Sequence, residues 1–533
     1  MSRTNGCYIS KFEYPRKINW CSVCNVPILS DANKCPLCGY DIKTLAVGKG
    51  EVRPVFEPEK EWYRDLLQSE GKDPDVWLPG GLAFYYRGSI IVGGEKVFRV
   101  TFDEANRKWM IKFFKKYQNK IPDIAGSIEK ILVEANLQTL EVAELESLNF
   151  IHYTRQEHHD MPMGVSFSGG KDSSVLLYLM RQLFPEIDVI YLNTTIDYPE
   201  TEKYIKELQS DWGFNLIEVR PSRDFFDFCE DLGPPSQYMR WCCKITKFAP
   251  LNRLIEERYG TTVLMASGIR KNESNSRNTY SKIQINDKIP KQLLFFPIFE
   301  WNSLLVWLYI FWKKIPINEA YQVGRSRIGC WACPERRSKE FSKLKRTHPN
   351  LWKKLSDTLY IYAKNNNIEN VDDWINFGKW RFRASKYNKS YIKTQKLCSQ
   401  YDQILYKINE DCNMEKIKEF LKVFGEKEST GKIFKIRNHF LEASIIGNNV
   451  RVSFNKPSSK IKNNFKSQIE KAVNCVNCGA CLGICEIGAI KIVNHEIKIS
   501  NECNHCLNCL NNNGLRNGCI ALNYKKSQKR VKY

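Results

Sequence analysis

The sequence has no long apolar stretch and no apolar region near its first residues. Its longest apolar run, Ser303 to Trp312, is about half of the roughly 20 residues that a membrane-spanning helix needs. The first segment, Met1 to Lys17, shows none of the apolar character of a secretory signal. We therefore expect a cytoplasmic protein with no membrane partner.

Acidic residues are also scarce, because 59 Asp and Glu stand against 81 Lys and Arg, which gives a formal charge of +22. A basic balance of this size favours acidic partners, nucleic acids among them. The 533 residues exceed one domain of roughly 100–200 residues, and an apolar fraction of 43% excludes wholesale disorder. Several folded domains are therefore expected.

The abundant residue is cysteine, with 20 copies. Where no secretory signal is present, clustered cysteines more often bind metal or carry out redox chemistry than form disulfides. Sixteen of them fall into four groups: Cys21, Cys24, Cys35 and Cys38; Cys242, Cys243, Cys330 and Cys333; Cys475, Cys478, Cys481 and Cys485; Cys503, Cys506, Cys509 and Cys519. The others are expected to act as small apolar side chains; they are Cys7, Cys229, Cys398 and Cys412.

The first group consists of two CxxC pairs separated by ten residues. Two such turns can direct four thiolates at one tetrahedral zinc ion, and Gly39 supplies a tight-turn residue after the second pair. Because four thiolates leave no open position, we expect a structural zinc ribbon in residues 1–50.

The last two groups, CxxCxxCxxxC and CxxCxxC with a later cysteine, resemble a bacterial-type two-cluster ferredoxin over about 60 residues. The resemblance implies that the fourth cysteine of each run binds the cluster of the other run. The implied 4Fe–4S sets are Cys475, Cys478, Cys481 and Cys519, and Cys503, Cys506, Cys509 and Cys485. The proline that follows the fourth cysteine in that family is Glu486 here. Two further zinc sites are the alternative.

Strand and helix patterns alternate after Met163. The expected strands are 164–167, 189–192 and 216–219, and the expected helices are 172–183 and 200–212. Alternation at this spacing is typical of a doubly wound parallel sheet. The sequence therefore predicts an α/β fold in residues 160–395.

A phosphate-binding loop is expected between the first of these strands and its helix, at the string SGGKDS. Two glycines let backbone N–H groups approach a phosphate, while a lysine and the helix N-terminus add positive charge. The spacing is not that of a Walker A loop. The expected nucleotide-binding residues are Ser168, Gly169, Gly170, Lys171, Asp172 and Ser173.

Further strings, in order along 163–340, resemble the phosphoadenylyl sulfate (PAPS) reductase family. They are LNTTIDYPET at 192–201, GIRKNES at 268–274 with Arg277, PIFEW at 297–301, NEAY at 318–321 and IGCWACP at 328–334. The resemblance implies a PP-loop domain that binds an adenylyl nucleotide. It implies catalytic roles toward substrate oxyanions for Lys171, Arg270 and Arg277, with Glu273 orienting Arg270 or holding a metal. A structural ion pair is the alternative for either arginine.

The adjacent cysteines at 242–243 and the CxxC at 330–333 match the CC…CxxC set of that family's adenylyl sulfate (APS) reductase and DNA phosphorothioation branches. The resemblance implies a third 4Fe–4S cluster, with Lys244 and Lys247 near it. Adjacent cysteines are awkward zinc ligands and would be strained as a disulfide.

Two reactions agree with these motifs. In the first, the protein reduces APS or PAPS to sulfite, and an electron donor passes electrons through the fused ferredoxin domain. In the second, the loop binds ATP and the protein is a sulfurtransferase that thiolates tRNA or DNA. The ferredoxin favours the first reaction, but the sequence lacks the ECGxH string that carries the reductases' nucleophilic cysteine. A third class is a pure electron-transfer or scaffolding protein.

A basic stretch at 376–396 contains no acidic residue and interleaves cations with aromatic side chains. Basic residues follow phosphates and aromatic residues stack on bases, so this stretch favours a nucleic-acid partner. A solvated basic surface is the alternative.

The remaining segments are assigned by their local patterns. Residues 51–159 are an accessory domain, a connecting or RNA-binding module, with strands near 78–82 and 86–94 and helices at 113–117 and 128–145. Residues 396–467 are a small α/β region with a hairpin near 445–452 and a linker from residue 455, and the ferredoxin domain occupies 468–533.

Overall fold

The computed structural model describes residues 17–47, 52–79, 83–114, 128–274, 276–382, 392–398, 402–430, 433–455, 457–482, 485 and 487–510. Cys7, Cys519 and the basic residues 525–532 lie outside these ranges, as do the side chains of 383–400.

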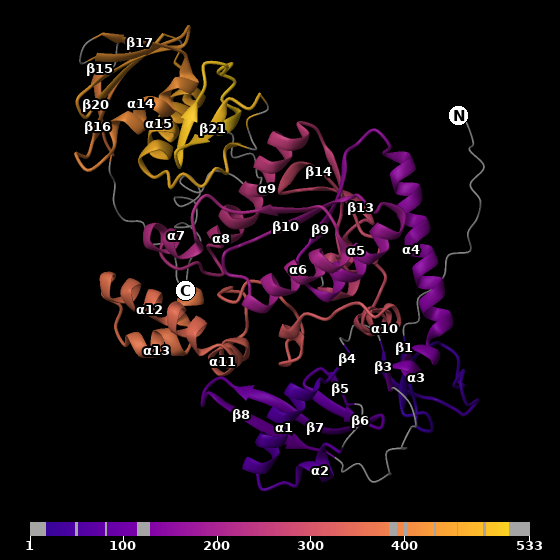
Figure 1. The fold of residues 1–533 in the computed structure, drawn as a ribbon. Helices are drawn as coiled ribbons and strands as arrows, with labels where there is room; N and C mark the ends of the chain where they lie inside the picture. Colours follow the sequence, from indigo (N-terminus) through magenta and orange to yellow (C-terminus); the bar gives the residue numbers. More distant parts are fainter. Residues whose placement is uncertain are drawn as a thin grey trace.

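A six-stranded sheet with the order β11-β10-β9-β12-β14-β13 forms the centre of the molecule (Figure 1). Its strands are β9 (Met163–Phe167), β10 (Asp188–Leu192), β11 (Leu216–Val219), β12 (Val263–Ala266), β13 (Ile283–Asn286) and β14 (Ile289–Phe295). Five strands are parallel, and β13 pairs antiparallel with β14 at one edge. The predicted α/β fold with a parallel sheet is therefore confirmed, with one antiparallel strand added.

Alternate residues of β12 enter different cores, which shows that both faces of the sheet are covered. Leu264 and Ala266 pack with helices of one face, and Val263 and Met265 pack with those of the other. The first face carries α4 (Leu137–Glu157), α5 (Lys171–Leu183), α6 (Pro199–Trp212) and α10 (Ser303–Lys313), and the second carries α9 (Ala249–Leu254). The longest apolar run thus becomes the buried helix α10. Among the described helices, none has the length and apolarity needed to cross a membrane.

Two small sheets precede the central sheet and share one apolar core. The first has the order β2-β1-β3 and consists of β1 (Lys17–Cys21), β2 (Val26–Leu29) and β3 (Lys43–Val47). The second is antiparallel and consists of β4 (Val52–Pro54), β5 (Ala83–Tyr86), β6 (Ser89–Val92), β7 (Glu95–Asp103) and β8 (Lys108–Phe113), with α1 (Glu57–Ser69) and α2 (Pro74–Trp77). Trp20 of the first sheet packs edge-on against Phe84 of the second, with ring centroids 5.7 Å apart.

The helix predicted at 113–117 is wrong at its start, because Phe113 ends strand β8. Side chains of β8 alternate between exposed and half-buried, which is the period of a strand, and β8 pairs along its length with β7. The strand expected near 78–82 also differs, since Leu78 follows α2 and β5 begins at Ala83.

The single helix predicted at 128–145 is divided into α3 (Ile128–Glu134) and α4. Asn136 separates them, because its side chain binds the backbone of β2. Its Nδ2 donates to the Pro27 carbonyl at 3.0 Å, and its Oδ1 accepts from the Leu29 N–H at 2.7 Å. An asparagine that bonds to neighbouring backbone competes with helix continuation.

The part of the chain after the central sheet begins with three helices and continues into a six-stranded antiparallel sheet. The helices are α11 (Ser338–Thr347), α12 (Pro349–Asn365) and α13 (Val371–Asn376). The sheet has the order β15-β16-β20-β19-β18-β17, with β15 (Ile392–Cys398), β16 (Gln403–Ile408), β17 (Glu426–Thr430), β18 (Ile433–Arg437), β19 (Leu441–Ile446) and β20 (Asn449–Phe454). The hairpin predicted near 445–452 is confirmed as β19–β20.

The linker predicted from residue 455 is wrong, because α15 (Ser459–Val473) forms there. Ser458 caps this helix by accepting from the Ile461 N–H at 3.2 Å. Phe465, Ile469 and Ala472 form a buried stripe at helical spacing beneath the polar residues. The stripe packs with α14 (Met414–Leu421) and the sheet, and a short hairpin of β21 (Ile490–Val493) and β22 (Glu496–Ile499) follows.

A buried ion pair connects the five-stranded sheet to the central domain. Arg53 donates two hydrogen bonds to Glu59, at 2.6 and 2.7 Å, and the Tyr63 hydroxyl donates to the same carboxylate at 2.7 Å. Arg53 and the buried Lys343 of α11 both donate to the carbonyl of Gly324, at 3.3 and 2.8 Å. The pair therefore fixes the position of the sheet through charged groups that have no access to water.

We expect Glu59→Ala to destabilise this junction strongly, because it leaves Arg53 buried without its counter-charge, a cost of about 3–5 kcal/mol. Urea unfolding followed by limited proteolysis of the 52–114 segment measures the effect. Asp357→Ala is the control, since it removes an exposed pair with Lys353 worth at most about 1 kcal/mol. Equal unfolding midpoints for the two variants would contradict the assignment.

Candidate functional site

The three segments predicted to bind the nucleotide meet because of the strand order. Strand β10 pairs with one side of β9 and β12 pairs with the other, so β9 is where the order reverses. Loops that follow parallel strands at such a point lie together at the carboxyl edge of the sheet, where ligands bind in open α/β folds. The approach is close, since a Cβ added at Gly268 after β12 would lie 3.0 Å from the backbone of Asp172.

Gly169 determines the shape of the phosphate loop. Its φ is +67°, in the left-handed region, and an added Cβ would lie 2.8 Å from Cγ2 of Thr201. Asn318 fastens the loop, because its Nδ2 donates to the Gly169 carbonyl at 3.0 Å and to the Thr201 hydroxyl at 3.1 Å. The SGGKDS, PET and N-x-x-Y strings of the sequence therefore form one structural unit.

The rest of the loop is closed by hydroxyl groups. The Ser173 hydroxyl donates to the Gly170 carbonyl at 2.9 Å and accepts from the Ser168 N–H at 3.2 Å. The Lys171 N–H, in the first turn of α5, donates to the Tyr321 hydroxyl at 2.9 Å. The loop thus ends at the N-terminus of a 13-residue helix, which adds a positive dipole end.

Asp172 lies between two cations. Lys171 Nζ is 2.8 Å from one carboxylate oxygen and Arg270 Nε is 2.6 Å from the other. Burial alone would raise the pKa of Asp172, but the charges of Arg270 and Lys171 outweigh it and lower this pKa to about 2. The carboxylate therefore stays ionised and positions Arg270, whose side chain is 1% exposed.

Glu273 gathers three arginines at the same edge. It lies 3.9 Å from Arg270 and 2.9 Å from Arg327, and it also pairs with Arg277. The geometry is that of the orienting role expected for Glu273. Arg327 was not predicted, although its place directly before the GCxxC string was an available signal. With Lys171, the site holds four cations against two carboxylates, an excess of positive charge that suits a polyanionic ligand.

The two halves of the central cysteine group converge beside this site. The Cys330 thiol lies 3.4 Å from the hydroxyl of Thr194, which follows β10. Burial raises the pKa of Cys333, and the neighbouring Cys330 and Cys243 raise it further. The CC and CxxC strings, almost ninety residues apart in the chain, therefore meet in one partly buried group.

A cation compensates the negative charge of this group. Cys243 accepts a hydrogen bond from the Cys242 thiol and lies near Lys247, so its pKa falls to about 6 although burial opposes the change. The pKa of Lys247 is raised, chiefly by Cys330. The position predicted for Lys247 beside the cysteines is confirmed.

The N-terminal cysteines have the spacing of a single-ion site. The sulfurs of Cys21, Cys24, Cys35 and Cys38 all lie within 4.8 Å of one another. Gly39 has a φ of +72°, as its turn role requires. The thiolates of a tetrahedral zinc site with Zn–S bonds of about 2.3 Å lie about 3.8 Å from one another. The sulfurs of Cys21 and Cys38 are 3.5 Å apart and those of Cys24 and Cys35 are 3.9 Å apart, so these four residues fit one metal ion.

No other group of cysteines in the described part of the chain is this compact. The four thiols of the central group, with Lys247 beside them, form a donor set that suits a metal centre. In the C-terminal part, burial raises the pKa of Cys503 and Cys509, and the neighbouring Cys485 raises both further. In the other C-terminal set, the fourth predicted ligand, Cys519, lies outside the described residues.

The first C-terminal cysteine run contacts the central domain close to the central group. Val476 and Cys478 pack against the apolar cluster to which Cys243 and Cys330 also belong. The Ser222 hydroxyl, after β11, donates to the carbonyl of Asn477 at 3.4 Å. Figure 1 shows the C-terminal part next to the segment that contains α7 (Phe225–Leu232) and α8 (Trp241–Cys243).

Several of the ungrouped cysteines and residues of the basic stretch are packed inside the fold. Cys229 is 4% exposed, and burial raises the pKa of Cys412 in the C-terminal core. In the basic stretch, Trp380 is buried, and Arg381 donates to the Arg336 carbonyl at 2.5 Å. These two residues stabilise the α11–α13 region and do not form an open binding face, which corrects that part of the prediction.

Residues 162–336 match the phosphoadenosine phosphosulfate reductase domain. An uncharacterised protein of Methanocaldococcus jannaschii is 37% identical over 483 residues, which cover 71% of this chain and 98% of that protein. The chain therefore contains a domain of the phosphoadenosine phosphosulfate reductase family. An adenosine 5'-phosphosulfate reductase of Bacillus cereus is 28% identical over 169 residues, which cover 31% of this chain and 70% of that enzyme.

Two solved structures are similar to parts of this chain. The PAPS reductase of Candida auris has 17% identity and a TM-score of 0.29, covering 39% of this chain and 98% of that one. The U34-tRNA thiolase of Methanococcus maripaludis, solved with its 4Fe–4S cluster, has 17% identity and a TM-score of 0.25, covering 45% and 80%.

The metal content tests the cysteine groups. We expect about one zinc and about twelve irons per chain after anaerobic reconstitution. Cys21→Ser should lose the zinc and keep the iron, because it removes one of four ligands from the compact site. Cys243→Ser should lose about four irons and keep the zinc, so each variant controls for the other. Elemental mass spectrometry measures both metals, and loss of the same metal from both variants would refute the assignment.

A second test concerns the phosphate loop. Gly169→Ala should abolish measurable nucleotide binding, because its Cβ would displace Thr201 and hence the loop. Gly213→Ala is matched to it, since Gly213 also has a positive φ, of +62°, but has open space around its Cβ position. Both variants bear a similar backbone cost of about 1 kcal/mol. Isothermal titration distinguishes them, and equal affinities would show that the contact with Thr201 is unimportant.

Proposed function

We propose that the protein binds an adenylyl sulfate at the phosphate loop and reduces it to sulfite, with electrons that enter through the C-terminal cysteine module. One observation carries the proposal. The phosphate loop, the central cysteines and the Val476–Cys478 segment come together around one edge of one sheet. An anion site, a partly buried thiol group and a second thiol-rich segment on the same apolar cluster suit redox chemistry on a phosphate-bearing substrate.

In this proposal the loop binds the phosphate end of the substrate and the arginines bind its sulfate end. The phosphate end of the substrate lies at the loop and the N-terminus of α5, where the helix dipole and the full charge of Lys171 are both positive. Arg270 is held by Asp172, which leaves Arg277 and Arg327, both partly exposed, as the groups able to reach the sulfate oxygens. A guanidinium fork can bind two oxygens at once.

The reaction balances without a further atom donor. The bond between the sulfate sulfur and the oxygen that bridges it to phosphate breaks. Two electrons reduce the sulfur from the +6 to the +4 state, so that sulfite leaves and the bridging oxygen stays on the nucleoside phosphate. The positive charge of Lys171, Arg277 and Arg327 stabilises the charge that develops on both products.

The cysteine groups fit the supply of those electrons. A 4Fe–4S cluster held by Cys242, Cys243, Cys330 and Cys333 would supply one-electron chemistry beside the substrate. The chain's own contribution is the packing of Cys478 on the apolar cluster that Cys243 and Cys330 also pack against, together with the Ser222–Asn477 hydrogen bond. Lys247 compensates the negative charge of the thiolates.

The alternative is an ATP-dependent sulfurtransferase that thiolates a nucleic acid. The same loop and arginines suit the phosphates of ATP. Of the cysteines outside the four groups, the two whose side chains the structure describes, Cys229 and Cys412, are not exposed, so neither is an accessible nucleophile. What favours reduction is that the two cysteine-rich parts pack against the same apolar cluster, because a redox-neutral transfer has no use for this arrangement.

The deciding experiment is an anaerobic assay of the reconstituted protein with APS, PAPS or ATP and a reduced viologen dye as donor. We expect sulfite from APS or PAPS and oxidation of about two dye equivalents for each sulfite. Lys171→Ala should lower kcat/KM by about 10²-fold or more, as for loss of a transition-state charge contact. The exposed Lys206 of α6 is the matched control, and Lys206→Ala should leave kcat/KM within about twofold.

Pyrophosphate release from ATP that tRNA or DNA stimulates, without sulfite from either sulfate, would sink the reductase proposal in favour of the sulfurtransferase. Nucleotide binding that Lys171→Ala leaves unchanged would argue that the loop has no role in either reaction.

A further inference from the structure

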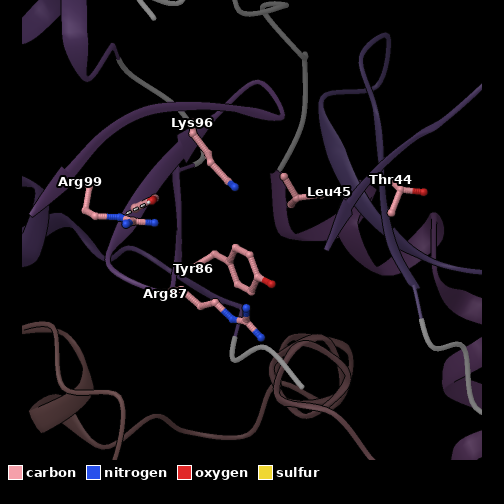
Figure 2. Close-up of a pocket in the computed structure, with 7 residues that line it drawn as sticks. Thr44, Leu45, Tyr86, Arg87, Lys96 and Arg99 are labelled. Atoms are coloured by element: carbon pink, nitrogen blue, oxygen red, sulfur yellow. Dashed lines mark hydrogen bonds between the residues drawn. The ribbon is translucent and has the colours of Figure 1, made fainter. Parts of the chain in front are cut away.

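A separate cavity of about 320 Å³ lies between β3 of the cysteine-bearing sheet and the five-stranded sheet (Figure 2). Its lining has three cationic side chains, one aromatic ring and no carboxylate; the residues are Thr44, Leu45, Tyr86, Arg87, Ser89, Lys96 and Arg99. None of them belongs to the phosphate loop or the cysteine groups. The proposed reaction therefore leaves this cavity without a role.

The strand register explains why these side chains meet. Arg99 of β7 is opposite Ser89 of β6, and Ser89 is opposite Tyr86 of β5. Directly opposite residues of antiparallel strands share a face, so these three residues form a row across the sheet. The next strand extends the row by one cation, because Lys112 of β8 is opposite Arg99.

The opposite wall of the cavity is fixed by close packing. Gly94 has a φ of +80°, and a Cβ there would lie 2.5 Å from the Trp20 ring of β1. This contact holds the first sheet against the turn between β6 and β7, and it places Thr44 and Leu45 over the row (Figure 2). The cavity is therefore a built feature of two packed sheets and not a gap between independent parts.

The charged groups surround the ring of Tyr86. The Arg87 guanidinium lies 5.3 Å and the Lys96 ammonium 5.9 Å from its centroid. Arg99 donates from Nε to the Ser89 hydroxyl at 3.2 Å, which directs its guanidinium along the row. Three cations without an acidic neighbour in the lining create a positive potential that favours an anion.

The cationic surface continues beyond the cavity along β8. Phe114 is 42% exposed and Met110 is 50% exposed. The Arg99 and Lys112 cations each lie 5.9 Å from the Phe114 ring. Cations that alternate with exposed apolar groups along an open sheet face are the pattern by which proteins hold single-stranded nucleic acids, with phosphates on the cations and bases on the rings.

We propose that this cavity and the adjoining face of β8 bind a single-stranded nucleic acid. One phosphate lies among Arg87, Lys96 and Arg99, and a neighbouring base stacks on Phe114. A small anion would need only the cavity, whereas the row through Lys112 to Phe114 extends the site along a strand. The proposal does not rest on which adenylyl nucleotide the phosphate loop takes.

The test is the binding of a fluorescein-labelled 12-nucleotide single strand, as RNA and as DNA of the same sequence, to the full chain between 50 and 200 mM KCl. Each phosphate contact of a single strand contributes about 0.7 to the slope of log affinity against log salt. The double variant Arg87→Ala/Lys96→Ala should lower the magnitude of the slope by about 0.7, because the one phosphate in the cavity loses two of its three cations. It should also weaken binding about tenfold or more, as expected when phosphate contacts are lost. Phe114→Leu should weaken binding about fivefold or more with the slope unchanged, as for one lost stacking contact.

The matched control is Lys427→Ala/Lys435→Ala, which removes the same charge from the exposed faces of β17 and β18. It should retain the wild-type slope and an affinity within about twofold. Binding of RNA alone, of DNA alone or of both supports the proposal and identifies the type of strand. The proposal is overturned if neither strand binds, or if the double variant and its control lose affinity equally.

Discussion

The parallel pairing of β9 with β10 on one side and β12 on the other is the constraint on which the candidate site depends. Because side-by-side parallel strands end at the same edge, the loops that follow them have nowhere else to lie. One loop supplies the phosphate-binding backbone, one reaches the CxxC cysteines through Thr194, and one supplies Arg270 and Glu273. The closeness of Gly268 to Asp172 shows how little space separates these loops.

Charge, and not shape alone, gives this edge its chemical character. Two carboxylates are each shared among several cations, so that the arginines and the lysine are positioned while a net positive charge remains for a ligand. In the neighbouring thiol group, Lys247 lies beside Cys243, the thiol whose pKa is lowered. A negative charge on that thiol is therefore balanced from within the fold.

The other parts of the chain are attached to this centre by contacts of different kinds. The five-stranded sheet is fixed by the buried Arg53–Glu59 pair and by a shared apolar core with the cysteine-bearing sheet. The C-terminal module touches the centre through a short segment around Cys478. In the first case the junction creates a cationic cavity away from the sheet edge, and in the second it packs cysteines of two groups against one apolar cluster. The same chain thus presents two separate surfaces that are rich in cations.

The sequence by itself was sufficient for whatever depends on local pattern. Alternating strands and helices predicted the α/β sheet, glycine and cysteine spacings predicted the phosphate loop and the cysteine groups, and the ordered strings predicted the family. Local pattern failed where packing decided the outcome. The lysines of α15 give its sequence the composition of a linker, although the helix has a buried apolar stripe. Asn136 divides a helix only because the backbone of β2 forms hydrogen bonds with its side chain.

Only the tertiary structure showed which distant residues meet. The sharing of Glu273 by Arg270, Arg277 and Arg327 joins residues of different segments, as does the row from Lys112 to Tyr86. Cys243 and Cys478, far apart in the chain, pack against one apolar cluster. These contacts between distant residues depend on strand order and register. Both result from burial over the whole domain, so no periodic pattern in the sequence indicates them. The sequence determined the kinds of chemistry available, and the fold decided where they combine.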